Sequence, residues 1–229
     1  MSDFLNLKPS LIHREIRDTM FGDLPLSRLV QVRHTATLTE PWASFQRARK
    51  LIEAGDQDAG KQELHQILKI PKLESRVYLQ AWHSLRELGE EPPRAIEKEV
   101  LGVVVEVGMR RGLDLISAYS DHRARYFNYS GAGILWDRPD DSLDEVIDDL
   151  LKQGAGVVQI IAPWRHPRPP EPTKGNARIN LLTPNGMHLG QGPVDALNSD
   201  PMGGAILASA FRLMQRLIDL KELKKDDAG

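Results

Sequence analysis

Cysteine is absent from the 229 residues of this chain, and its absence excludes several kinds of chemistry at once. Without thiols the protein has no disulfide bond, no thiolate zinc site, no iron–sulfur cluster and no cysteine nucleophile. A chain without cysteine also fits a reducing compartment, so we expect a cytoplasmic protein.

An excess of charge of either sign is also absent. Lysine and arginine number 30 against 32 aspartates and glutamates, which leaves a net charge of -2. Nucleic-acid-binding proteins usually carry a basic excess, because the release of counterions from the phosphates drives binding. We therefore predict no nucleic-acid partner.

Long hydrophobic runs are missing as well. No window approaches the roughly 18 to 20 apolar residues that are needed to span a bilayer. The first residues, MSDFLNLKPSL, do not combine a basic start with an apolar stretch and so do not resemble a secretory signal. We expect a soluble protein with no membrane partner.

The common catalytic and metal-binding motifs are lacking too. No two histidines stand at a spacing that metal motifs use, and HExxH does not occur. Gly131-Ala132-Gly133 and Gly190-Gln191-Gly192 are not followed directly by a predicted helix, which phosphate loops require. We predict no metal site and no cofactor, and we assign no catalytic residue. The histidines are His13, His34, His65, His83, His122, His166 and His188.

The stretch from 100 to 137 has the pattern of an antiparallel β-meander. Short runs of β-branched, leucine and aromatic residues are separated by Arg110-Arg111-Gly112, Ser120-Asp121-His122 and Ser130-Gly131. We expect Trp136, which closes an apolar run, to be buried. Further along, Asn185-Gly186 between two apolar runs predicts a second hairpin.

Helical periodicity dominates the first part of the chain. It predicts helices over residues 10–20, from Pro41 to about Gly55, over 58–68 and over 73–88. The Pro92-Pro93 pair then breaks the helical pattern. We predict a helical region over residues 1–91 and an α+β domain over residues 92–229.

One part of the helical region resembles a known repeat. In ARKLIEAGDQDAGKQELHQILKIPK, Ala59 is followed by Pro71 at the small-residue-to-proline spacing of tetratricopeptide units, and Gly55-Asp56 suits their turn. The segment 41–72 therefore resembles a single tetratricopeptide-type helical hairpin. A second copy at a period near 34 residues, which an array requires, does not occur.

The rest of the domain predicts two helices around a hairpin. The apolar period runs through residues 142–162, which we interpret as one helix; a helix to Gln153 followed by a strand over 157–162 is the alternative. Five prolines in 163–175 indicate a loop, and Ser199-Asp200-Pro201 opens a long final helix. We predict an α+β fold in which an N-terminal helical layer precedes a mostly antiparallel sheet, a meander plus a hairpin, packed against two helices.

Candidate binding residues come from the meander and the hairpin. Asp121-His122-Arg123 has the composition of an acid–base site, but a β-turn explains it better. Arg123 and Arg125 are two residues apart in a strand and therefore share one face of the sheet. An exposed arginine and aromatic face would suit a partner. The candidate binding residues are Arg123, Arg125, Tyr126, Trp136 and His188.

Three hypotheses for the function remain open. The first is a non-catalytic, cytoplasmic protein-interaction module, an adaptor or assembly subunit that binds a protein partner or a second copy. The second is a small-molecule or nucleotide-binding sensor domain with a pocket lined by Arg125, Tyr126, Trp136 or His188. The third is a hydrolase centred on Asp121 and His122.

The predicted helices between residues 41 and 88 bear on the first hypothesis. A single helical layer either leaves one face free for a partner or is covered by residues 1–40 of its own chain. We expect Arg47, Gln62 and Arg86 to occupy solvent-exposed positions on these helices.

Overall fold

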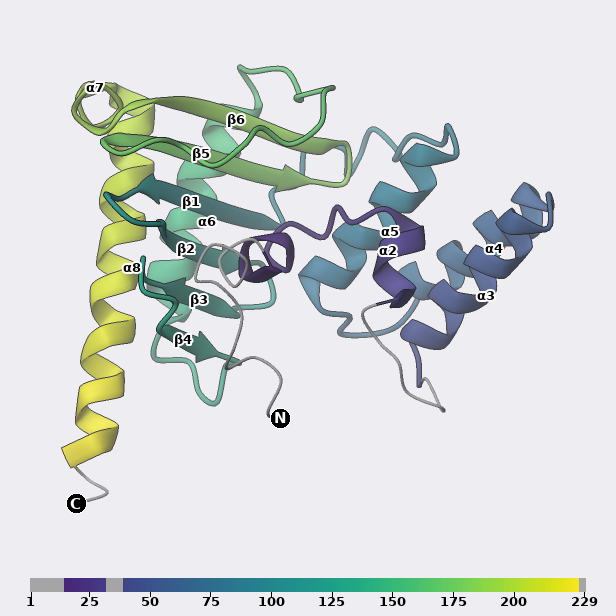
Figure 1. Cartoon of the computed structure of the whole chain (residues 1–229), viewed down its shortest axis with the longest axis horizontal. Helices are drawn as coiled ribbons and strands as arrows, with labels where there is room; N and C mark the ends of the chain where they lie inside the picture. The colour runs from purple at the N-terminus through teal and green to yellow at the C-terminus, as the bar shows by residue number, and fades with distance from the viewer. Residues whose placement is uncertain (1–14, 32–38, 227–229) are drawn as a thin grey trace.

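The computed structural model describes residues 15–31 and 39–226, which form helices and one six-stranded antiparallel sheet (Figure 1). The predicted α+β class is confirmed. The helices are α2 (Leu26–Gln31), α3 (Trp42–Glu53), α4 (Gln57–Leu68), α5 (Ser75–Glu87), α6 (Asp144–Val158), α7 (Val194–Ser199) and α8 (Pro201–Asp226). The strands are β1 (Gly102–Gly108), β2 (Leu113–Tyr119), β3 (Ala124–Phe127), β4 (Gly133–Trp136), β5 (Asn176–Thr183) and β6 (Gly186–Pro193).

The strand order of the sheet is β4-β3-β2-β1-β5-β6, and every neighbouring pair is antiparallel. The predicted meander is confirmed as β1 to β4, and the predicted hairpin as β5 and β6. The hairpin loop is one residue earlier than expected. Its two central residues are Pro184 and Asn185, while Gly186, at a φ of 116°, already begins β6 and pairs with Thr183.

Helices α6 and α8 cover one face of the sheet, which we call the helix face (Figure 1). Side chains of alternate strand residues point to this face and form the largest apolar core. They include Val103, Val105, Ile116, Ala118 and Trp136, packed against Ile147, Leu150, Leu213 and Leu217 from the two helices. Trp136 is 5% exposed, as predicted.

The helix predicted over residues 142–162 is confirmed in its central part and ends earlier than expected. It spans Asp144–Val158, and no strand follows at 157–162, so the alternative is wrong. Gly154 does not end the helix; it lets α6 approach the sheet closely, because a Cβ there would lie 3.0 Å from Leu181. Val158 is the last buried residue of the helix, and Ile161, the next residue of the apolar period, is only half-buried and lies beyond the helix end.

One short helix was not expected. Helix α7 begins at Val194, directly after Pro193, so the statement that no helix follows Gly190-Gln191-Gly192 is wrong. The helix lies against β6 and α8. It has no buried residue, which explains why the sequence lacks a helical apolar period there.

Residues from the N-terminal part of the chain lie on the other face of the sheet, which we call the opposite face. Met20 and Phe21 pack there with Val104, Tyr119 and Leu182. The Tyr119 hydroxyl donates a hydrogen bond of 2.8 Å to the carbonyl of Met20. This segment follows a turn of helix at 15–18; residues 10–14 of the predicted first helix lie outside the described residues.

The helical layer consists of α3, α4 and α5 and lies beside the sheet (Figure 1). Phe45, Leu64 and Trp82 form its core, and Leu29 of α2 packs against it. Residues near α2 therefore cover part of this layer. Helix α5 joins the layer to the sheet, because Leu79 packs with residues at the start of β1 and the end of β5.

The prediction that Arg86 occupies a solvent position is wrong. Its guanidinium donates a hydrogen bond to the carbonyl of Pro184 in the β5–β6 loop. Burial lowers the pKa of Arg86 to about 10. The side chain is therefore part of the contact between α5 and the sheet. Arg47 and Gln62 are exposed as expected.

Helices α2 to α5 precede residue 91, and all strands follow it. The division of the chain into two domains at that point stays a prediction. No helix in the described parts of the chain combines the length and the apolar character that are needed to cross a bilayer.

Candidate functional site

The strand register separates the five predicted binding residues. Arg125 stands opposite Ser117 and Leu135, and its side chain lies on the opposite face, as does that of Arg123 two residues earlier. Tyr126 and Trp136 belong to the core under the helices. The predicted residues therefore do not line one pocket.

His188 is also on the helix face, because it pairs with Leu181. It is 1% exposed, and its Nδ1 lies 2.9 Å from the carbonyl of Ile161. Burial lowers the pKa of His188, which favours the neutral ring. Its Nε2 is buried and has no hydrogen-bond partner among the described residues. These contacts fix the position of residues after α6 and explain the burial of this histidine without a ligand.

Asp121 and His122 turn away from each other. Asp121 Oδ2 accepts a hydrogen bond of 3.0 Å from the backbone N–H of Ser75 and thus caps the first turn of α5. The ring of His122 lies 2.9 Å from Asp148 Oδ1 on α6. The backbone of His122 is in the left-handed region, at a φ of 59°. Both side chains hold elements together, which agrees with a turn rather than a paired acid and base.

Arg123 and Arg125 differ in how well they are paired. Arg123 donates a hydrogen bond of 2.8 Å to Asp121. Arg125 makes no hydrogen bond within residues 15–31 and 39–226; Asp137 Oδ1 lies 3.8 Å from its Nη2. Burial, and then the positive charge of Arg76, lower the pKa of Arg125. Arg76, Arg123 and Arg125 thus lie near three carboxylates, Glu74, Asp121 and Asp137. Of the three arginines, Arg125 is the one that donates no hydrogen bond within the described ranges.

Strand β4 forms one edge of the sheet beside these arginines. The N–H of Asn128 donates to the carbonyl of Ala132, so these two residues form a hydrogen-bonded pair. Hydrogen-bonded and non-hydrogen-bonded pairs alternate along antiparallel strands. Gly133 and Leu135 are therefore in non-hydrogen-bonded pairs, and their N–H and C=O groups point away from β3. Lys221 reaches the carbonyl of Gly133 at 3.3 Å. The backbone groups of Leu135 have no partner among the described residues, and its side chain is 55% exposed.

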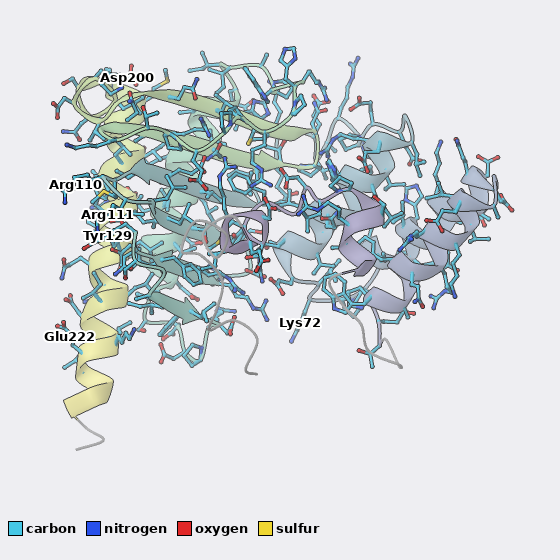
Figure 2. All side chains as sticks on the ribbon, in the orientation of Figure 1. Lys72, Arg110, Arg111, Tyr129, Asp200 and Glu222 are labelled. Carbon is cyan, nitrogen blue, oxygen red and sulfur yellow. The ribbon has the colours of Figure 1, made fainter. Side chains whose placement is uncertain are left out.

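Other exposed apolar side chains lie on this side of the molecule. Tyr129, in the β3–β4 turn, is 48% exposed and lies beside α8 with Arg110 and Arg111 in Figure 2. Leu223, near the end of α8, is 59% exposed; the preceding residue, Glu222, marks this part of the helix in Figure 2. In the described part of the chain, no large hydrophobic side chain of α3, α4 or α5 is comparably exposed. The apolar surface therefore favours the β4 edge over the helical layer as a docking site.

A second polar feature lies at the centre of the opposite face. Glu106, in β1, is fully buried between two guanidinium groups. Arg17 donates to both carboxylate oxygens, and Arg178 of β5 donates to one of them, Oε2, at 3.1 Å. The amide of Asn180 also donates to that oxygen, at 3.2 Å. Two buried cations therefore share one buried anion.

The proline-rich loop closes over this cluster. The carbonyl of Pro169 accepts hydrogen bonds from Arg17 at 2.9 Å and from Arg178 at 3.4 Å. Arg168 forms ion pairs with Asp18 and Asp23. Burial raises the pKa of Asp23, and the charge of Arg168 opposes that rise. The cluster thus joins the N-terminal segment, the loop and the sheet.

A groove of about 420 Å³ opens beside this cluster, between the proline-rich loop and the adjoining ends of β5 and β6. Arg178 lines it although the residue is only 3% exposed. Gln191, whose Oε1 accepts a hydrogen bond of 3.0 Å from Arg178 Nε, lines it as well. The remaining lining residues are Pro169, Pro170, Glu171, Pro172, Thr173, Asn176, Ala177 and Gly192.

The cluster around Glu106 was not predicted from the sequence. Its signal was the presence of Glu106 within GVVVEVG and of Arg178 and Asn180 within NARINLLT. Ionisable residues in the middle of apolar strands are rarely buried unless they are paired. Pairing across adjacent strands, and with Arg17 far away in sequence, could not be seen from the strands alone.

Among the described residues, no group of three or more histidine, aspartate or glutamate side chains could hold a metal ion. Comparison of this chain with known protein families, curated proteins and solved structures finds no match. The geometry of the chain therefore carries the functional argument by itself.

Proposed function

We propose that the protein is a non-catalytic interaction module that binds an extended segment of a partner protein along the free edge of β4. The unpaired backbone of Leu135 at this edge carries the proposal. Edge strands with free N–H and C=O groups pair readily with another strand, and most proteins block them with charges, prolines or bulges. β4 has the sequence GILW, which contains none of these residues.

The charges near β4 point to the chemistry of the partner. Arg123 Nε and Arg125 Nη2 lie 3.7 and 3.8 Å from the exposed carboxylate of Asp137, directly after the strand. Arg125 has no hydrogen bond among the described residues, so a carboxylate brought in by a partner would gain one. The partner segment is therefore an extended strand with an acidic residue near the C-terminal end of β4, and with an apolar residue beside Leu135.

Two further observations support an interaction role. Helices α3 and α4 pack against each other within the segment that resembles a tetratricopeptide-type hairpin, and hairpins of that type are common in interaction proteins. The absence of cysteine supports a cytoplasmic location. The alternative of a hydrolase finds less support, because Asp121 and His122 bind different elements.

Selection from a randomised peptide library displayed on phage tests this proposal. We expect enriched peptides with alternating apolar residues and an acidic residue near one end. Leu135→Lys should weaken their binding at least about tenfold, because it places a charge on the docking edge. Arg125→Gln should weaken the binding of peptides that contain the acidic residue and should leave unchanged the binding of peptides in which glutamine replaces it. Arg49→Gln, on α3, is the matched control.

Methylation of backbone nitrogens in an enriched peptide tests the pairing itself. Methyl groups on alternate residues should abolish binding in one register and leave it nearly unchanged in the other, because only every second N–H of a strand faces β4. Enriched peptides that bind Leu135→Lys as tightly as the wild type would contradict the proposal. So would a library with no enriched sequence, or an edge occupied by β4 of a second copy in solution.

A further inference from the structure

We propose that the groove between the proline-rich loop and the ends of β5 and β6 binds a small carboxylate ligand, with Arg178 as the residue that receives it. This site is separate from the β4 edge, at the other side of the sheet. The inference does not depend on the proposed partner.

The hydrogen bonds of Arg178 use only two of its three guanidinium nitrogens. Its Nε donates to Gln191, and its Nη1 donates to Glu106 and to the carbonyl of Pro169. Its Nη2 has no hydrogen-bond partner within residues 15–31 and 39–226. It is not among the fully buried nitrogens of the described residues that lack a partner, so it reaches solvent. This free nitrogen belongs to a residue that is 97% buried and yet lines an open groove, where an anion could accept a hydrogen bond from it.

The carboxylates of the cluster are unevenly distributed. Arg17 and Arg178 share the single carboxylate of Glu106, whereas the neighbouring Arg168 is paired with two aspartates, Asp18 and Asp23. Burial lowers the pKa of Arg178; the charge of Glu106 opposes this shift and that of Arg17 reinforces it. Glu171 also lines the groove, but it is exposed, so solvent screens its charge. An anion in the groove would place a second negative charge beside Arg178, which shares Glu106 with Arg17.

The size of the groove and its hydrogen-bond donors favour a carboxylate over a phosphate. The groove offers few hydrogen-bond donors: the free guanidinium nitrogen of Arg178 and the side chains of Thr173, Asn176 and Gln191. A carboxylate needs fewer donors than a phosphate, which carries more charge and more acceptor oxygens. The groove of about 420 Å³ has room for a small organic acid. We therefore assign a carboxylate rather than a phosphate.

The position of the loop is held by close backbone contacts. Gly108, at the end of β1, accepts a hydrogen bond of 3.0 Å from Gly175 N–H. A Cβ on Gly108 would lie 2.1 Å from the carbonyl oxygen of Thr173. The proline-rich loop is thus seated directly on β1, so the groove is formed before any ligand arrives.

Titration of the full chain with acetate, succinate and citrate, followed by NMR of the arginine Nε–Hε groups, tests the assignment. We expect a shift of the Arg178 resonance with saturation, and a Kd of about 1 mM or lower for at least one of the three acids. Inorganic phosphate and sulfate, at the same ionic strength, should bind more weakly.

The variant Gln191→Glu provides a decisive comparison. It places a carboxylate of the chain itself beside Arg178, so it should keep the fold and weaken binding of the acid at least about tenfold. Gln62→Glu, at an exposed position of α4, adds the same charge elsewhere and should leave binding unchanged. Thermal unfolding verifies that both variants fold.

Three results would overturn the assignment. The first is an Arg178 resonance that none of the acids shifts. The second is phosphate or sulfate bound more tightly than every carboxylate. The third is equal affinity of Gln191→Glu and wild type, which would show that the ions bind elsewhere on the surface.

Discussion

Glu106 is the residue on which three parts of the chain converge. Its carboxylate is fully buried in β1 and contacts Arg17, Arg178 and Asn180. A buried ion pair adds little net stability compared with apolar packing, but removal of one partner leaves an uncompensated charge in the interior. The interactions at this single position therefore help to hold the N-terminal segment and the proline-rich loop on the sheet.

The substitution Glu106→Gln tests this role. It keeps the size of the side chain and removes its charge, so both arginines lose their counter-ion. We expect a loss of about 3 to 5 kcal/mol in the free energy of unfolding, measured by urea denaturation. Glu53→Gln removes an exposed partner of Arg49 and should cost less than about 1 kcal/mol. Equal, small losses in the two variants would show that the cluster is not coupled to folding.

His83 of α5 should make stability depend on pH. Burial, and then Arg86 and Arg168, lower the pKa of His83 to about 4, although Glu87 Oε1 lies 3.7 Å from its Nε2. Burial raises the pKa of Glu87, which weakens its effect on the ring. The unfolded chain, with an ordinary histidine pKa near 6.5, takes up the proton first as the pH falls. Stability is therefore complete above about pH 7 and declines between about pH 6.5 and 4.

The His83→Gln variant lacks this proton uptake. We expect the stability difference between wild type and variant to change by up to about 3 kcal/mol between neutral pH and about pH 4. Urea denaturation at several pH values measures it, and an NMR titration of the His83 ring gives its pKa directly. A ring that titrates near 6.5 would contradict the prediction.

At the scale of elements, backbone contacts decide where the loops and helices lie. The proline-rich loop rests on Gly108, and α6 approaches the sheet at Gly154. The first turn of α5 is capped by Asp121, which is distant in sequence. Local sequence explains why each helix forms, whereas these contacts determine how the helices and the loop are placed against the sheet.

Gly108→Ala should displace the proline-rich loop. Its methyl group would lie 2.1 Å from the Thr173 carbonyl oxygen and 2.5 Å from that of Pro172, and backbone cannot yield as a flexible side chain does. We expect a loss of about 1 to 3 kcal/mol in the free energy of unfolding and faster hydrogen exchange at the Gly175 amide.

The matched control for this prediction is Gly156→Ala. No heavy atom lies within 4 Å of an added Cβ at this position of α6. Alanine is the better helix former, so we expect a gain of about 0.5 to 1 kcal/mol. If both alanine variants gain stability, the loop is not seated on β1 as described.

At the scale of the whole molecule, balanced charge limits the kinds of partner. Basic side chains such as Arg47, Arg49 and Arg138 are paired with nearby carboxylates. The net charge of -2 leaves little counterion release to drive binding to phosphates. The two sites that we propose instead use individual arginines that lack a full set of partners.

We expect no general affinity for nucleic acids. Fluorescence anisotropy with labelled single- and double-stranded DNA and with RNA, at physiological salt, should give no dissociation constant below about 10⁻⁴ M. Tight binding to unrelated sequences would mean that basic residues gather on one surface, and Arg110→Gln with Arg111→Gln would be the first variant to examine beside Tyr129.

The sequence by itself determined the fold class, the meander, the second hairpin and the main helices. Those features follow from local alternation and periodicity, which each segment carries within itself. It also determined the burial of Trp136, because that residue closes an apolar strand. Helix α7 and the end of α6 escaped prediction, since the first buries nothing and the second ends while the apolar period continues.

Tertiary structure alone decided which of the candidate residues come together. Alternation in the strands placed Arg123 and Arg125 on one face, and Tyr126, Trp136 and His188 under the helices. The Glu106 cluster depends on strand order, because β1 and β5 become neighbours although about 70 residues separate Glu106 from Arg178. The free edge of β4 and the groove beside Arg178 arise in the same way, from which strands pair and where the pairing stops.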